Sequence, residues 1–149
     1  MIQLPKITIS FKVTRPTNYS PTIIKRSEEL ADVVRNLFDS KTFDWTEEML
    51  LMCLNRRNEI MHYSKISQGG MTGTVCYVRV VMLTALQSAA TSIVLAHNHP
   101  SGSLKPSQQD IQITEQVRQA GLVHEIKLLD HIIFTTDSFY SMRDEGDIF

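Results

Sequence analysis

The stretch that decides the fold is Ala96-His97-Asn98-His99-Pro100-Ser101-Gly102-Ser103-Leu104-Lys105-Pro106-Ser107-Gln108-Gln109-Asp110. It begins at the end of an apolar run, Ile93-Val94-Leu95-Ala96, crosses a loop with proline and glycine, and ends in the first turn of a predicted helix. Residues two apart on a strand point to the same face, so His97 and His99 can reach one ion. Asp110 would add a carboxylate from the helix. The stretch therefore predicts a strand–loop–helix unit that carries a metal site.

Two imidazoles and one carboxylate leave a position for water, which is the arrangement of catalytic zinc sites. We expect one zinc ion (Zn2+) per chain, although iron, manganese and cobalt accept the same donors. The run from Ser107 to Asp110 also fits a helix-capping pattern, Ser-x-x-Asp, which is common without any metal. The two interpretations are compatible. A capping serine can donate its own proton outward, and an aspartate in the first turn stays ionised beside the helix N-terminus.

Strands and helices alternate around this stretch, which indicates an α/β domain with a mixed β-sheet flanked by helices. Apolar residues that alternate or run unbroken predict strands, and apolar residues at helical spacing predict helices. The predicted strands are 7–13, 49–54, 59–66, 92–96, 126–129, 132–135 and 139–142, and the predicted helices are 27–38, 78–89 and one from Asp110 to a stop at Gly121. The glycine-rich run 69–73 lacks the Gly-Lys-Ser/Thr ending of a phosphate loop and predicts a flexible connection.

Size and composition place the chain among ordinary globular domains. Its 149 residues are 42% hydrophobic, enough for one real core. Lysine and arginine number 15 against 16 acidic residues, so the formal net charge of −1 gives little support to nucleic-acid binding. No apolar run approaches a membrane span, and the polar N-terminus lacks the apolar core of a signal peptide. With only two cysteines, the sequence predicts a reduced, cytoplasmic protein without a membrane anchor.

The spacing of His97, His99, Ser107 and Asp110 resembles the JAMM motif of MPN-type metalloproteases. Three longer runs are similar to the RadC branch of that superfamily: 97–102 with Pro106-Ser107, 128–133, and 144–146 with Asn55-Arg56 upstream. The resemblance covers Ser27 to the C-terminus. It implies a JAMM/MPN domain over 27–149, a three-layer fold similar to cytidine deaminases, with residues 1–26 as an N-terminal extension that adds a strand.

The resemblance also implies roles for single residues. The family has a glutamate at the start of an upstream strand that acts as general base, and the family register places it at Glu47. Glu48 is the neighbouring alternative, and strand alternation puts Glu47 on the face of Met49 and Glu48 on the other. Ser107 would donate to the oxyanion of the reaction. Residues 130–131 would have a supporting role behind a ligating histidine.

The reaction that the resemblance implies is zinc-dependent hydrolysis of a peptide or isopeptide bond, in a peptide or protein substrate. RadC-like proteins have also been associated with DNA repair, so a role in binding or processing nucleic acid is the first alternative. A non-catalytic MPN interaction module is the second, and it predicts broken metal ligands, whereas His97, His99 and Asp110 are all present. A zinc deaminase is disfavoured, because its His-x-Glu and Pro-Cys-x-x-Cys signature is absent.

Overall fold

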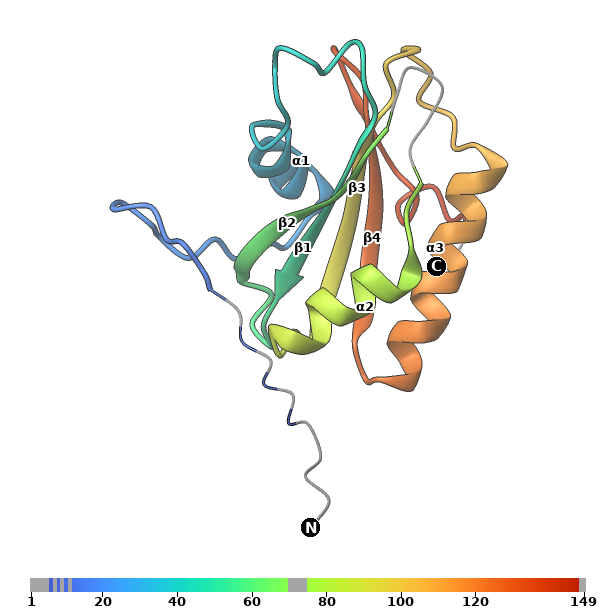
Figure 1. The fold of residues 1–149 in the computed structure, drawn as a ribbon. Helices are drawn as coiled ribbons and strands as arrows, with labels where there is room; N and C mark the ends of the chain where they lie inside the picture. Colours follow the sequence, from blue (N-terminus) through green and yellow to red (C-terminus); the bar gives the residue numbers. More distant parts are fainter. Residues whose placement is uncertain (1–5, 7, 9, 11, 70–74, 148–149) are drawn as a thin grey trace.

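A computed structural model describes residues 6, 8, 10, 12–69 and 75–147. Within them the chain forms one mixed sheet in the order β2-β1-β3-β4-β5, flanked by three helices (Figure 1). The elements are α1 (Ser27–Arg35), β1 (Glu48–Leu54), β2 (Ile60–Gln68), α2 (Val78–Gln87), β3 (Ser92–Asn98), α3 (Gln108–Val123), β4 (Lys127–Phe134) and β5 (Phe139–Ser141). Only β3 and β4 pair in parallel. The predicted α/β class and mixed sheet are confirmed.

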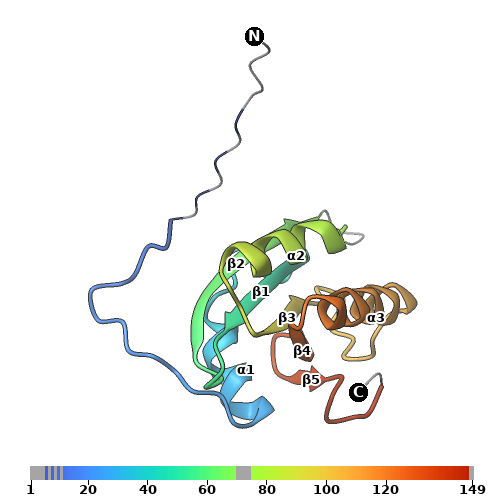
Figure 2. The same ribbon diagram turned by 90° about the horizontal axis from the view of Figure 1, so that it is seen from below.

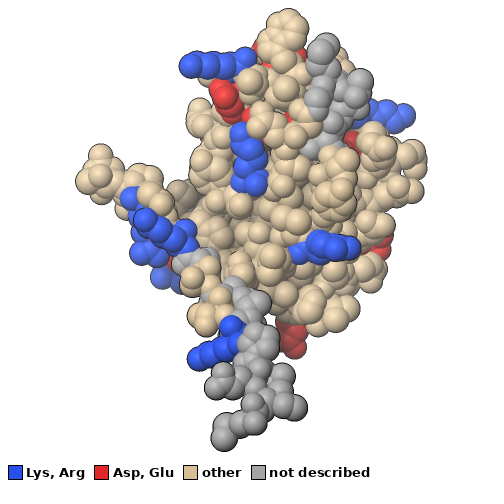
Figure 3. Space-filling view, viewed as in Figure 1, with Lys and Arg blue, Asp and Glu red and all other residues tan. Residues whose placement is uncertain are grey.

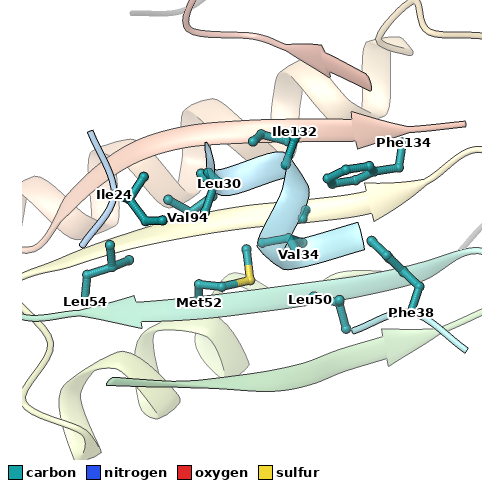
Figure 4. Close-up of a cluster of buried hydrophobic side chains, with 12 residues drawn as sticks. Ile24, Leu30, Val34, Phe38, Leu50, Met52, Leu54, Val94, Ile132 and Phe134 are labelled. Carbon is teal, nitrogen blue, oxygen red and sulfur yellow. The ribbon is translucent and has the colours of Figure 1, made fainter. Parts of the chain in front are cut away.

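Helices cover both faces of the sheet, so β1 and β3 are buried along their whole length. Seen along the sheet, α1 lies on one side and α2 and α3 lie on the other (Figure 2). The α1 side buries alternate residues of β1, among them Leu50 and Met52, against Val34 of the helix (Figure 4). The opposite side buries Met49 and Leu51 against α2 and α3. This alternation decides which face each polar residue at the strand ends will occupy.

The pairing of strands brings distant parts of the chain to one edge of the sheet. Antiparallel pairing of β1 with β3 sets Met49 opposite His97, so the start of β1 meets the end of β3. The loop after β3 leads into the N-terminus of α3 at the same edge (Figure 1). The fold therefore gathers the start of β1, the end of β3 and the start of α3, which carry the residues of the predicted site.

The predicted stop of the last helix at Gly121 is wrong, because α3 continues to Val123. A Cβ atom on Gly121 would lie 2.3 Å from the carbonyl oxygen of Ile126, so glycine is required here for a close approach of the chain. A hydrogen bond joins the same two residues, in which the Ile126 N–H donates to the carbonyl oxygen of Gly121 at 2.8 Å. The glycine thus serves the turn into β4 from inside the helix.

Two predicted short strands, 126–129 and 132–135, form a single strand, β4. The gap between the two predicted strands falls at Asp130 and His131, but both are buried within the strand. A register shift beside Ile93 leaves Leu129 as an extra residue of β4. The separation into two strands was wrong because the polar pair finds its hydrogen-bond partners elsewhere in the fold.

The predicted N-terminal strand falls partly outside the described residues, since Ile7, Ile9 and Phe11 are not among them. The described Lys12 and Val13 belong to no strand. Within the described residues, an isolated bridge joins Ile23 to Glu59, which lies just before β2. The division at residue 26 and the added strand remain predictions. Most of the predicted connection at 69–73 also lies outside the described residues.

Candidate metal centre

Three predicted ligands come together where β3 ends and α3 begins. His97 is fully buried at the end of β3, His99 follows it, and Asp110 lies in the first turn of α3. The two Nε2 atoms are 2.8 Å apart. One oxygen of Asp110 lies 3.2 Å from Nε2 of His97, and the other lies 3.4 Å from Nε2 of His99. All the ligand atoms lie within 4.8 Å of one another, close enough to bind one ion.

A chain of hydrogen bonds behind His97 fixes which of its nitrogens carries the proton. Nδ1 of His97 lies 2.8 Å from Nε2 of His131, and Nδ1 of His131 lies 2.6 Å from the Thr114 hydroxyl. Thr114 donates its only proton to the carbonyl oxygen of Asp110. His131 must therefore donate to Thr114 and accept from His97. This leaves a lone pair on Nε2 of His97, as metal binding requires.

His131 can perform this role because it stays neutral. Complete burial, together with the nearby ring of His97, holds the pKa of His131 well below its usual value of 6.5. The sequence indicated a supporting role for residues 130–131, and the contact between the rings of His131 and His97 places one of them directly behind a ligand. Sequence reasoning missed Thr114. Its position four residues after Asp110, on the same side of a helix, was the available signal.

His99 is oriented in the same sense by the loop that follows it. Its Nδ1 lies 2.6 Å from the carbonyl oxygen of Ser103, which can only accept. Nε2 of His99 therefore also has a lone pair that faces His97 and Asp110. Two imidazole lone pairs and one carboxylate converge with no proton between them in this arrangement. This donor set fits a divalent metal ion, and its mixed nitrogen and oxygen character suits zinc.

The pKa values of the cluster also indicate a demand for positive charge. Burial alone would raise the pKa of Asp110, but the two imidazole rings beside its carboxylate, which favour the ionised form when they carry a positive charge, outweigh burial and hold that pKa well below the usual range. Burial alone would lower the pKa of His99, but the hydrogen bonds to Asp110 and to the Ser103 carbonyl raise it. Both shifts favour a negative carboxylate beside a cation.

Ser107 caps α3 as the sequence predicted. Its hydroxyl oxygen accepts from the Asp110 N–H at 3.1 Å, and its own N–H donates to the Asp110 carboxylate at 2.7 Å, which completes a capping box. The hydroxyl proton does not point outward as expected. It is donated to the same carboxylate at 2.6 Å, because an ionised oxygen is the strongest acceptor in reach. The role of Ser107 as oxyanion donor remains a prediction.

Glu47 and Glu48 lie on opposite faces of the sheet. Glu47 lines a cavity of about 560 Å³ together with His99, Ser107 and Asp110, and its charge helps to raise the pKa of His99. Glu48 is only 1% exposed, on the face of α1, where its carboxylate contacts the ammonium group of Lys65 at 2.9 Å. Glu47, and not Glu48, therefore lies on the side of the candidate metal ligands.

Comparison with known proteins supports the family resemblance of the sequence. The sequence model of the RadC-like JAB domain matches residues 24–147, which include every residue of the candidate centre. The chain belongs to the RadC-like JAB domain family. Other members similar to it are named UPF0758 proteins. The one from Flavobacterium johnsoniae is 44% identical over 67% of this chain and 44% of its own length. The one from Streptococcus gordonii is 34% identical over 95% of this chain and 62% of its own length.

A third UPF0758 protein, from Porphyromonas gingivalis, is 42% identical over 67% of this chain and 44% of its own length. The RadC-like chain thus spans between 44% and 62% of the length of these curated relatives. None of the helices in its described part combines the length and apolar character that crossing a bilayer requires.

Proposed function

We propose that this RadC-like JAB domain is a zinc-dependent hydrolase that cleaves an amide bond, peptide or isopeptide, in a peptide or protein substrate. One observation carries the proposal. The donor atoms of His97, His99 and Asp110 converge at the wall of a cavity of about 560 Å³ that Glu47 also lines. A carboxylate beside a cation site, open to a cavity, is the arrangement that activates water for attack on a carbonyl group.

The roles of the side chains follow from their positions. Zinc held by His97, His99 and Asp110 would supply a Lewis acid that lowers the pKa of water toward about 7. Glu47 would accept the proton of the attacking water and deliver it to the departing amine. Ser107 would donate to the negative charge that develops on the substrate oxygen, after its proton turns away from Asp110 by rotation about the Cβ–Oγ bond.

The walls of the cavity support a peptide substrate. Three glutamines, Gln109, Gln112 and Gln116, lie on one side, and apolar side chains such as Met49 and Ile113 lie among the others. Side-chain amides can both donate to and accept from a peptide backbone. On the face drawn in Figure 3, lysine and arginine side chains are scattered over the domain and gather only around the segment that precedes α1. With a net charge of −1, this favours a peptide over a nucleic acid.

A reducing compartment such as the cytoplasm agrees with the state of the cysteines. Cys53 and Cys76 are both free, and burial raises the pKa of Cys76 to about 11. Thiols in this environment are poor nucleophiles and pack as small apolar groups. We propose a cytoplasmic location, which the free cysteines support.

The proposal is tested with the zinc-reconstituted protein and two matched variants, Glu47→Gln and Glu48→Gln. Zinc content is measured by elemental analysis. Hydrolysis is measured by mass spectrometry of a proteome-derived peptide library that includes lysine-linked isopeptides, with a supercoiled plasmid as a parallel probe. We expect one zinc per chain in all three proteins.

Glu47→Gln should lower hydrolysis by about 100-fold or more, because the proton acceptor is lost. Glu48→Gln should keep hydrolysis, and its free energy of unfolding should fall by about 2 kcal/mol, because the buried charge partner of Lys65 is lost. Failure to bind zinc, equal loss of hydrolysis in both variants, or nicking of the plasmid without peptide cleavage would each refute the proposal.

A further inference from the structure

Asn98 lies between the two histidine ligands in the sequence, and its side chain points to the opposite face of the sheet. Strand alternation sets His97 and His99 toward α3 and the amide of Asn98 toward the α1 side. The residue is 0% exposed. A buried primary amide has two donors and an acceptor to satisfy, so its partners reveal what it holds.

All three partners of Asn98 are backbone groups in the segment that leads into β1. Its oxygen accepts from the Glu48 N–H at 2.7 Å. Its nitrogen donates to the carbonyl of Phe43 at 2.6 Å and to that of Thr46 at 2.8 Å. The orientation of the amide is unambiguous, because the reverse assignment would set its NH2 group against an N–H and its oxygen against two carbonyls.

These contacts lie where the backbone pairing of the sheet ends. The last backbone pair between β1 and β3 is Met49 with His97. Glu47 comes two residues before Met49, beyond that ladder. On the β2 side, its carbonyl accepts from the Gly69 N–H at 2.9 Å. On the β3 side, the chain is connected through the Asn98 side chain, which bonds the residue before Glu47 and the residue after it.

We propose that Asn98 is a positioning residue for Glu47, which it holds against the cavity by fixing the backbone on both sides of it. The end of β3 then supplies two candidate metal ligands on one face, and the Asn98 amide on its other face fixes the backbone that carries Glu47. This inference rests on the proposed function for its catalytic consequence. The backbone clamp itself stands on the three hydrogen bonds and is testable without any substrate.

Neither aspartate nor alanine can make all three of these hydrogen bonds. Aspartate retains the acceptor for the Glu48 N–H but turns a carboxylate toward two carbonyl oxygens. Alanine leaves the Glu48 N–H and two carbonyls without partners. Both changes leave the imidazoles of His97 and His99 in place on the opposite face. Both variants should therefore displace Glu47 without releasing the metal.

The experiment compares Asn98→Ala and Asn98→Asp with Asn55→Ala, a matched control at the other end of β1. Asn55 also clamps a turn, since its oxygen accepts from the Arg57 N–H at 2.9 Å and from the Glu59 N–H at 3.2 Å. Three quantities are measured on each zinc-loaded full chain. They are amide hydrogen exchange, zinc per chain, and kcat and KM for the library peptide that the wild type cleaves fastest.

We expect both Asn98 variants to speed exchange over 43–48 by about tenfold or more, the factor that one lost hydrogen bond gives, with exchange over 49–54 unchanged. Zinc should remain at one per chain. The kcat should fall by about 100-fold with little change in KM, as a misplaced catalytic group predicts. Asn55→Ala should speed exchange only over 55–60 and keep kcat.

Three results would overturn the inference. Unchanged hydrogen exchange over 43–48 would show that Asn98 does not hold this backbone. Faster exchange with an unchanged kcat would show that holding it does not matter for catalysis. Loss of zinc together with activity makes Asn98 a support of the ligands and not of Glu47. If Asn98→Ala does not fold, the isosteric Asn98→Asp decides. If the wild type binds zinc and cleaves no peptide, the proposed function fails, whereas the exchange over 43–48 still tests the clamp.

Discussion

Two buried carboxylates of this molecule, Asp110 and Asp130, have pKa values that are shifted in opposite directions. Their exposed fractions are nearly equal, 6% and 4%, so burial alone does not separate them. Asp130 is fully satisfied from within the protein. One oxygen accepts from the N–H groups of His131 at 2.7 Å and Arg143 at 3.1 Å, and the other accepts from the Ser141 hydroxyl at 2.6 Å.

Asp110 faces two imidazole nitrogens that have no proton to give in their neutral tautomers. Its pKa is lowered, whereas burial raises the pKa of Asp130 despite the hydrogen bonds from Ser141 and the Arg143 N–H. One cluster is closed, since each acceptor has its donor. The other leaves two imidazole lone pairs beside a carboxylate, which a bound cation would complete. The difference teaches that a buried polar cluster points to a ligand through its unmatched lone pairs and not through its burial.

The strongest test of this comparison exchanges each carboxylate for an amide. Asp110→Asn should weaken zinc binding by more than about 100-fold, because a charged ligand is removed and the new NH2 group can bond to Nε2 of His97. Asp130→Asn should leave zinc binding unchanged, and its free energy of unfolding should fall by about 1–3 kcal/mol, because one of its acceptor oxygens becomes a donor. Chelator competition measures the first quantity and urea denaturation of the metal-free protein measures the second. Unchanged zinc binding in Asp110→Asn, or weaker zinc binding in Asp130→Asn, would contradict the distinction between the two clusters.

The second test concerns the neutral state of His131. Its pKa in the folded protein lies well below 6.5, the value expected for the unfolded chain. Below pH 6.5 the unfolded chain binds a proton at this ring and the folded chain does not, so the free energy of unfolding falls as pH falls. In His131→Asn this slope should be smaller by up to about 1.4 kcal/mol per pH unit. Urea denaturation of the metal-free proteins between pH 5 and 7 measures it. Identical slopes would mean that His131 is not held neutral.

The smallest expected effect comes from Thr114, which links His131 to the carbonyl of Asp110. Thr114→Val keeps the shape of the side chain and removes the hydroxyl, so the rings lose their fixed orientation and zinc binding should weaken by about tenfold. Thr84→Val is the matched control, because Thr84 also donates to the carbonyl four residues earlier in a helix, that of Val80, at 2.9 Å. The control should leave zinc binding unchanged. Equal effects in both variants would remove the link between Thr114 and the ligands.

The sequence predicted those parts of the fold and of the site that depend on residues close together in the chain. Unbroken apolar runs predicted β1 and β3, because strands covered on both faces need apolar side chains throughout. Period-two alternation predicted that Glu47 and Glu48 occupy opposite faces, and the structure confirms it. The spacing of the histidines and of Asp110 predicted that they would meet, since a strand end, a loop and a helix start are adjacent in the sequence.

Features that depend on distant partners could not be predicted in this way. Gly121 suggested the end of a helix, because the close approach of the Ile126 carbonyl is not visible in the sequence. Residues 130–131 fell in the gap between two predicted strands, because Ser141 and Thr114, which satisfy them, lie in other elements. The direction of the Ser107 proton depends on the final position of one carboxylate oxygen, which the capping pattern leaves open.

The antiparallel pairing of β1 with β3 has a consequence for biogenesis. It joins Glu47 to ligands that are synthesised about fifty residues later, and the third ligand follows later still. Contacts between such distant residues form only when the long loop between them has closed. A chain that is fully synthesised but not folded therefore carries every candidate ligand without having the binding site. The topology of the sheet would tie loading of the proposed zinc site to completed folding, so the zinc content of a preparation would report the fraction of chains that have folded.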